Sequence, residues 1–147
     1  MKNLFLFITL ALLACVIISC KRDPFAANYD IEAFSLKDFN DHKELAKFLE
    51  PHFPPGTPRK YIEHILIDVG KMQKTAEVPW DVYKDASGLG HGNKYKDILK
   101  SFKSDHKVVY RAAGSSNIVS WMVAAHYDEK DNLLLMDAYG NLISKKE

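Results

Sequence analysis

The sequence predicts an α+β domain in which two N-terminal helices pack on a three- to four-stranded antiparallel sheet, as two layers. Two segments with apolar residues at every third or fourth position come first, and segments that alternate apolar and polar residues follow. The 147 residues are 47% hydrophobic and 27% charged, as in an ordinary globular protein with one core. We therefore expect a single folded domain over residues 36–147.

The first helix is expected from about Asp41 to Glu50. Asp41 suits the N-cap, and Glu44 stands three residues later, as in a capping box. Pro51 is expected to end the helix, because proline has no backbone N–H to donate. The apolar residues on one face are Leu45, Phe48 and Leu49.

The second helix is expected to begin at Thr57-Pro58, with the threonine as N-cap and the proline at the first helical position. Gly70 closes the pattern, where a left-handed C-terminal cap would need a glycine. The stripe that should face the core consists of Tyr61, Ile62, Ile65, Leu66 and Val69.

After the helices the period of the apolar pattern changes to two, which indicates strands. The first candidate strand, residues 78–83, contains Pro79 and therefore suits a sheet edge. The polar run 128–132 is predicted to form a hairpin loop. The other expected strands cover residues 107–112, 117–127 and 133–139. The core face of the longest strand should consist of Val119, Trp121, Val123, Ala125 and Tyr127.

The N-terminus has the pattern of a secretory signal peptide over residues 1–19. Lys2 supplies a short positive region, and an apolar run follows from Leu4 to Ile18. That run is shorter than the roughly 20 apolar residues that a membrane-spanning helix needs. The sequence therefore favours an exported protein over one that spans the membrane.

The apolar run ends in Ile17-Ile18-Ser19-Cys20, which resembles the lipobox of bacterial lipoproteins. This resemblance implies cleavage between Ser19 and Cys20 and lipidation of the Cys20 thiol, with several acyl chains as a stable membrane anchor. Lys21 stands where an aspartate would retain an enterobacterial lipoprotein in the inner membrane. We expect an outer-membrane protein that faces the periplasm, the alternative being the outer face of the plasma membrane.

Residues 20–35 mix charge, proline and small residues, so we expect a tether there.

The composition of the mature chain excludes several kinds of site and partner. The other cysteine, Cys15, lies in the predicted signal peptide, which leaves the mature chain no thiol for disulfides, zinc binding or catalysis. Without residues 1–19, 19 basic residues balance 19 acidic ones, so no nucleic-acid partner is expected. We also expect no metal and no cofactor.

Candidate catalytic groups are few, and the sequence assigns no catalytic residue. His126 and Asp128 are two residues apart and could form an acid–base or metal pair, although a histidine beside a turn is the more ordinary interpretation. The glycine-rich run 87–93, which includes His91, lacks the Lys-Ser/Thr pair of a phosphate-binding loop. Gly114-Ser115 lacks the second glycine of a nucleophile elbow.

The order of these motifs resembles the BamE/SmpA-like small lipoproteins over residues 45–139. The resemblance implies a non-enzymatic accessory role at the outer membrane, in β-barrel assembly or envelope integrity. Residues 85–106 form an insertion relative to that pattern, so no binding residue is transferred. The matching segments are Phe53 to Pro58, Ile62 to Gly70, Trp80 to Tyr83 and His126 to Leu135.

The expected function is that of a lipid-anchored interaction or assembly module that binds an envelope protein or peptidoglycan. Aromatic side chains are enriched at interaction hot spots, and Trp80, Trp121 and Tyr127 are the candidate contact residues. Two alternatives stay open. One is a small envelope hydrolase that uses His126 or His91, and the other is a periplasmic inhibitor or a carrier with a ligand cavity between its layers.

Overall fold

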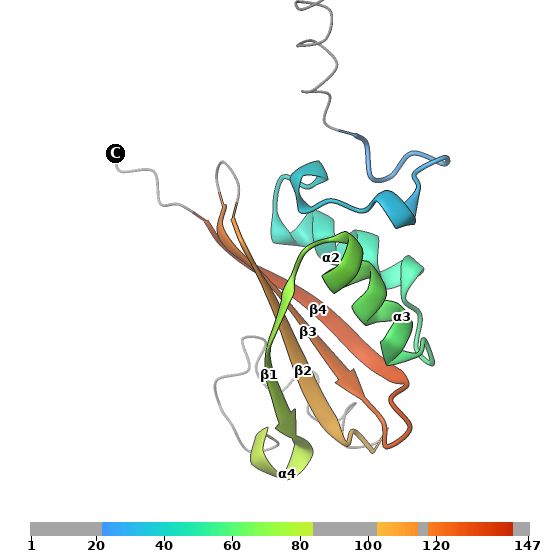
Figure 1. Cartoon of the computed structure of the whole chain (residues 1–147), viewed down its shortest axis with the longest axis vertical. Helices are drawn as coiled ribbons and strands as arrows, with labels where there is room; N and C mark the ends of the chain where they lie inside the picture. The colour runs from blue at the N-terminus through green and yellow to red at the C-terminus, as the bar shows by residue number, and fades with distance from the viewer. Residues whose placement is uncertain (1–21, 84–102, 115–117, 143–147) are drawn as a thin grey trace, which may run out of the picture.

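The computed structural model describes residues 22–83, 103–114 and 118–142. It confirms the predicted α+β class, because helical segments from the N-terminal half lie over one face of an open, four-stranded antiparallel sheet (Figure 1). The strands follow one another across the sheet in chain order. The described elements are η1 (Ile31–Ala33), η2 (Leu36–Asp38), α2 (His42–His52), α3 (Arg59–Glu63), η3 (His64–Val69), β1 (Gln73–Pro79), α4 (Trp80–Tyr83), β2 (His106–Ala113), β3 (Ile118–Tyr127) and β4 (Leu133–Leu142).

The segment before α2 differs from the tether that was predicted up to residue 35. Phe34 is 2% exposed and stacks on the Phe48 ring of α2, with ring centroids 5.8 Å apart. Asp38 is 5% exposed and accepts hydrogen bonds from Arg22 and Tyr29 at 2.7 and 2.9 Å. The sequence pattern missed this packing because short 3-10 turns give buried residues no constant spacing. The described part of the folded body therefore begins at residue 22.

The first predicted helix is confirmed as α2, with Asp41 as its N-cap. The Asp41 carboxylate accepts hydrogen bonds from the N–H groups two and three residues later, at 2.8 and 2.9 Å. Glu44 accepts a hydrogen bond from the N–H of Asn40, the residue before the N-cap. The helix continues through Pro51 to His52, because a missing N–H in the last turn leaves the earlier turns intact. The predicted core residues Leu45, Phe48 and Leu49 are buried.

The second predicted helix forms as α3 and continues into the wider π-helical turn η3. The predicted N-cap, Thr57, was wrong, whereas Gly70 is the C-cap residue as predicted but does not have the left-handed conformation. Thr57 donates its hydroxyl hydrogen bond to the Pro54 carbonyl at 2.6 Å, and Pro58 itself is the N-cap, with an extended backbone. Gly70 has a φ of −76°, and a Cβ there would lie 2.6 Å from the Phe34 ring, so this glycine serves close packing. Of the predicted stripe, Ile62, Ile65 and Leu66 are buried, Val69 is partly buried and Tyr61 is 39% exposed.

The predicted strands 107–112, 117–127 and 133–139 are confirmed as β2, β3 and β4. The first predicted strand, 78–83, was placed wrongly: β1 ends at Pro79, and Trp80–Tyr83 form the short helix α4. Proline cannot continue the ladder of backbone hydrogen bonds, which explains the end of β1. The prediction that Pro79 belongs to an edge strand is confirmed, since β1 is the first strand of the sheet.

The core lies between the helices and the sheet. The predicted core face of β3 is confirmed for four of its residues, while the Val119 side chain lies outside the described part of the chain. The 128–132 loop is also confirmed, with the N–H of Asp128 donating to the Asn132 carbonyl at 3.0 Å. The largest side chains that are fully buried are Trp121, Tyr110, Tyr127, Phe48, Leu45, Leu49, Ile62, Ile65, Leu66, Met72, Leu133 and Val108.

Candidate functional site

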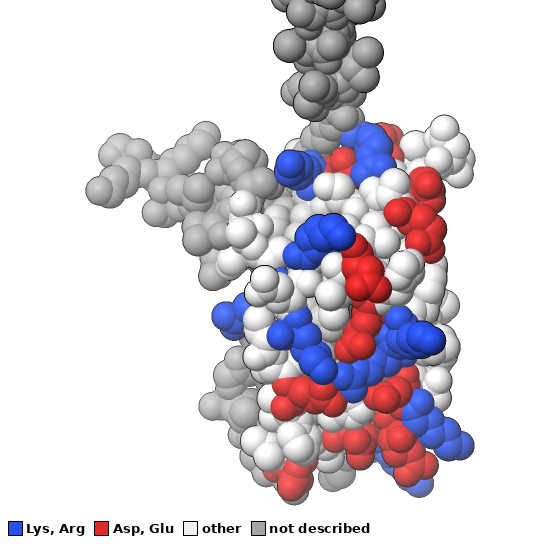
Figure 2. All heavy atoms as spheres, in the orientation of Figure 1, with Lys and Arg blue, Asp and Glu red and all other residues white. Residues whose placement is uncertain are grey.

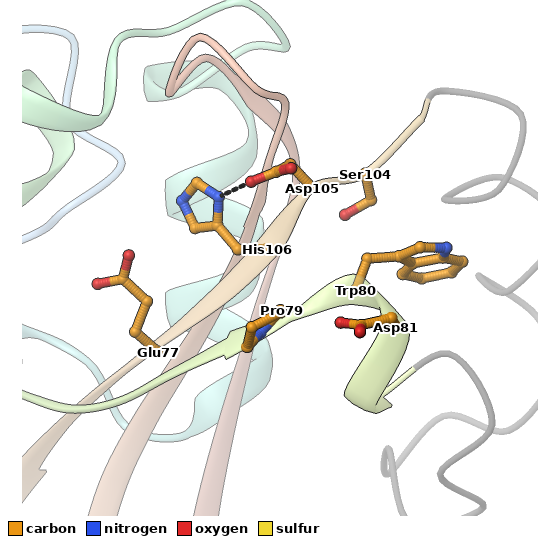
Figure 3. A pocket seen from close by; sticks show the side chains of 7 residues that line it. All are labelled: Glu77, Pro79, Trp80, Asp81, Ser104, Asp105 and His106. Atoms are coloured by element: carbon orange, nitrogen blue, oxygen red, sulfur yellow. Dashed lines mark hydrogen bonds and ion pairs between the residues drawn. The ribbon is translucent and has the colours of Figure 1, made fainter.

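A surface pocket of about 510 Å³ lies where β1 passes into α4 and β2 begins. Figure 3 shows residues of β1 and α4 on one side of this pocket and the start of β2 on the other. We call it the Trp80 pocket. Its lining residues are Glu77, Pro79, Trp80, Asp81, Ser104, Asp105 and His106.

Backbone hydrogen bonds fix the two sides of the Trp80 pocket to each other. The N–H of Trp80 donates to the Asp105 carbonyl at 2.7 Å, and the N–H of Asp105 donates to the Tyr127 carbonyl at 2.9 Å. Pro79 pairs with His106 across the β1–β2 ladder. The pocket is therefore built on the end of the sheet, which is a more rigid support than a loop alone.

Arg59 is the centre of the charged groups beside the pocket. Its guanidinium contacts Glu63, Glu77 and Asp131 at 2.9, 2.7 and 3.2 Å, and its side chain is only 14% exposed. Two parallel hydrogen bonds join it to the Glu77 carboxylate, an arrangement that is stronger than a single neutral bond. These bonds, aided by Lys74, lower the pKa of Glu77 to about 2. Hydrogen bonds to Glu77, and also to Glu63 and Asp131, raise the pKa of Arg59. The guanidinium of Arg59 and the carboxylate of Glu77 therefore both stay charged near neutral pH.

His106 lines the pocket with both of its ring nitrogens engaged. Nδ1 lies 2.9 Å from an Asp105 oxygen, and Nε2 lies 3.2 Å from Arg59 and 3.1 Å from an Asp131 oxygen. The neutral ring can donate from Nδ1 to Asp105 and accept at Nε2 from Arg59, whereas the protonated ring can donate from Nε2 to Asp131. The ring also stacks on Tyr127, with centroids 5.4 Å apart. These contacts hold the imidazole in one orientation.

The described residues in and beside the pocket carry more negative than positive charges. Glu77, Asp81 and Asp105 line it, and Asp131 lies within contact distance of its His106. Among the described residues, Arg59 pairs with Glu77 and Asp131, and Lys74 pairs with Glu77. Figure 2 shows positive and negative side chains gathered together over the lower half of the body in that view. An aromatic ring beside surplus carboxylates is a suitable environment for a cation.

The structure separates the three aromatic residues that were predicted as contacts. Trp80 lines the pocket, although it begins a helical turn instead of lying on a strand. Trp121 and Tyr127 are 0% exposed and belong to the core, so neither side chain reaches the surface in this conformation. Ser19 and Cys20, the predicted cleavage and lipidation positions, lie outside the described residues.

The structure does not bring the predicted histidine–aspartate pair together as a site. Burial, followed by the charge of Lys107, lowers the pKa of His126 to about 3, and its side chain points to the sheet face opposite the core. Asp128 accepts hydrogen bonds from Lys130 and Asn132 within its own loop. The run 87–93 with His91, and Ser115, lie outside the described residues.

Sequence reasoning missed Arg59, Asp105 and His106 as site residues. Arg59 is 18 residues from Glu77 and 72 from Asp131, and no local pattern reports such pairs. The only local signal was the adjacent pair Asp105-His106, in which a carboxylate can orient an imidazole.

The ranges that the structure describes are 22–83, 103–114 and 118–142. Within them, no helix is both long and apolar enough to cross a membrane. Nor do these residues include a group of three or more histidine, cysteine, aspartate or glutamate side chains placed to hold a metal ion. Comparison with family models, with curated proteins and with solved structures finds no match to this chain.

Proposed function

We propose that this protein is a lipid-anchored, non-catalytic envelope protein that binds an envelope protein or peptidoglycan through the Trp80 pocket. The lipobox-like run Ile17-Ile18-Ser19-Cys20 supports the anchor. The observation that supports the binding role is the surface pocket at the end of the sheet, whose lining includes Trp80 and three carboxylates. The proposed location is the outer membrane facing the periplasm, or the outer face of the plasma membrane in a host with one membrane.

A basic group suits this pocket better than an acidic or apolar one. An ammonium or guanidinium group gains from the surplus of carboxylates and from the face of an indole within about 6 Å. A protein partner would offer it as a lysine or arginine side chain, and peptidoglycan would offer it as a free amine. Binding should therefore weaken at high salt, because most of the carboxylates are partly exposed.

The charged groups beside the pocket favour binding over proton transfer. A general acid or base works best with a pKa close to the working pH, whereas the pKa of Glu77 is about 2. His106 has carboxylate or guanidinium partners at both ring nitrogens. Such fixed, mutually paired groups are suited to hold a partner in one orientation.

The proposal is tested by purifying the tagged full-length protein from its own host after gentle detergent extraction. We expect a stoichiometric envelope partner with the wild type and its loss with Trp80→Ala. Val82→Ala is the matched control, because Val82 is 65% exposed on the same short helix and does not line the pocket. This control should keep the partner.

Two results would contradict the proposed function. Retention of the partner by Trp80→Ala would show that the pocket is not the binding site. Purification of the acylated protein without any partner, followed by the finding of hydrolase activity or a bound small molecule, would favour the hydrolase or carrier instead.

A further inference from the structure

The folded body leaves almost no free chain between its surface and the proposed lipid anchor. If Cys20 is the lipidated residue, as the proposed function requires, only Lys21 separates it from Arg22. Arg22 already belongs to the body, because it pairs with Asp38 at 2.7 Å and lies 5.3 Å above the Tyr29 ring. Two residues span at most about 7 Å, so the anchor holds this end of the body at the membrane surface.

The surface at this end presents an aromatic ring beside an ammonium group. Phe25 is 47% exposed, and the Lys47 nitrogen lies 5.2 Å from the centre of its ring. A turn holds the ring outward, since Asp23 accepts hydrogen bonds from the N–H groups of Phe25 and Ala26 at 2.9 and 3.2 Å. A ring that enters the headgroup region beside a lysine that stays in water is typical of protein surfaces at membrane interfaces.

The Trp80 pocket lies at the other end of the molecule. In Figure 1, the blue segment from residue 22 to η1 lies at the upper end of the described body, and helix α4 lies at its lower end. The pocket adjoins α4 and is therefore far from the anchored end. If the anchored end docks on the membrane, the pocket therefore faces away from it.

We propose that the surface around Phe25 and Lys47 docks on the lipid headgroups of the membrane that anchors Cys20, so that the Trp80 pocket points away into the aqueous space. This inference rests on the proposed lipid anchor and adds an orientation to it. The occupant is the bilayer itself, because the two-residue link brings no other surface so close to Phe25.

The orientation is tested by spin labels on the acylated mature protein, reconstituted in vesicles made from the lipids of its host. Because the mature chain has no free thiol once Cys20 is acylated, a single introduced cysteine takes the label. The variants are Phe25→Cys at the docking surface and Val82→Cys on α4, with Lys47→Cys as a second docking variant should Phe25→Cys disturb the turn. At each position, the accessibility of the spin label to oxygen, which concentrates in lipid, is compared with its accessibility to a water-soluble nickel complex.

We expect the oxygen-to-nickel ratio to be several-fold higher at position 25 than at position 82, and position 47 to be intermediate. Equal ratios at positions 25, 47 and 82, on protein whose N-terminal peptide is acylated, would overturn the docking while leaving the anchor intact. An unmodified Cys20 in the same preparation would instead refute the proposed anchor and the docking with it.

Discussion

Protonation of His126 should be the main cause of stability loss between pH 7 and pH 5. His126 is 7% exposed on β3 and lies directly opposite Lys107 of β2. Burial, and then the nearby ammonium, lower the pKa of its imidazole from 6.5 to about 3. Over this pH range the unfolded chain therefore binds more protons than the native protein, and stability falls as the pH falls.

The size of this effect follows from the two pKa values. With 6.5 in the unfolded chain and about 3 in the folded one, linkage gives a loss of about 2 kcal/mol from pH 7 to pH 5. Continued acidification to pH 3 would bring the loss to roughly 4 to 5 kcal/mol, which approaches the whole stability of many small domains. Glu77 adds to the loss only below about pH 4.5, where its unfolded form becomes protonated.

The assay is urea unfolding of the purified protein in mild detergent at several pH values, followed by tryptophan fluorescence. His126→Gln keeps a polar side chain but cannot be protonated, so the loss between pH 7 and pH 5 should shrink by about 2 kcal/mol. The absolute stability of the variant at pH 7 does not enter this comparison. The same pH slope in wild type and variant would refute the assignment to His126.

Three further predictions concern other parts of the fold. The pKa of His64 is raised by hydrogen bonds first to Glu32 and then to Asp68, so its stabilisation is present below pH 6.5 and lost as the pH rises through the folded pKa. His64→Gln should thus destabilise at pH 5 and have little effect at pH 9, and an equal effect at both would contradict this. Arg59→Met leaves three carboxylates without their shared cation and should lower the free energy of unfolding, measured with urea at pH 7, by about 2 kcal/mol. Loss of one partner of a fully buried ion pair would lower it more, but Glu77 is 42% exposed. Gly70→Ala should lower the free energy of unfolding by about 1 to 3 kcal/mol, because the added methyl group would contact the Phe34 ring. In thermal unfolding, the same substitution should be less destabilising in a Phe34→Leu background. An equal effect in both backgrounds would show that the strain does not come from Phe34.

Much of the fold could be predicted because its long elements follow simple periods. Trp121 and Tyr127 were placed on the core face by the alternation of β3 alone. Trp80 was misplaced because the run 78–83 fits both a strand and a strand that ends in a helical turn at Pro79. Gly70 was misinterpreted because left-handed caps and close packing both require glycine, and only the position of Phe34 distinguishes them.

Of the residues at the candidate site, only Trp80 was predicted from the sequence. The charged cluster joins Arg59 of α3, Glu77 of β1, His106 of β2 and Asp131 of the β3–β4 loop, and these positions meet only when the sheet forms. Ion pairs between distant residues leave no periodic signal in a single sequence. The packed N-terminal segment was missed for a related reason, since its buried residues follow no regular spacing.

The lipid anchor is tested most directly by the mass of the N-terminal peptide of the protein isolated from the membranes of its own host. Cleavage before Cys20 and acylation of that cysteine predict a peptide that begins at Cys20 and is heavier by a diacylglyceryl group. A peptide that begins at Met1, or one that begins at an unmodified Cys20, would contradict the anchor and every proposal that depends on it.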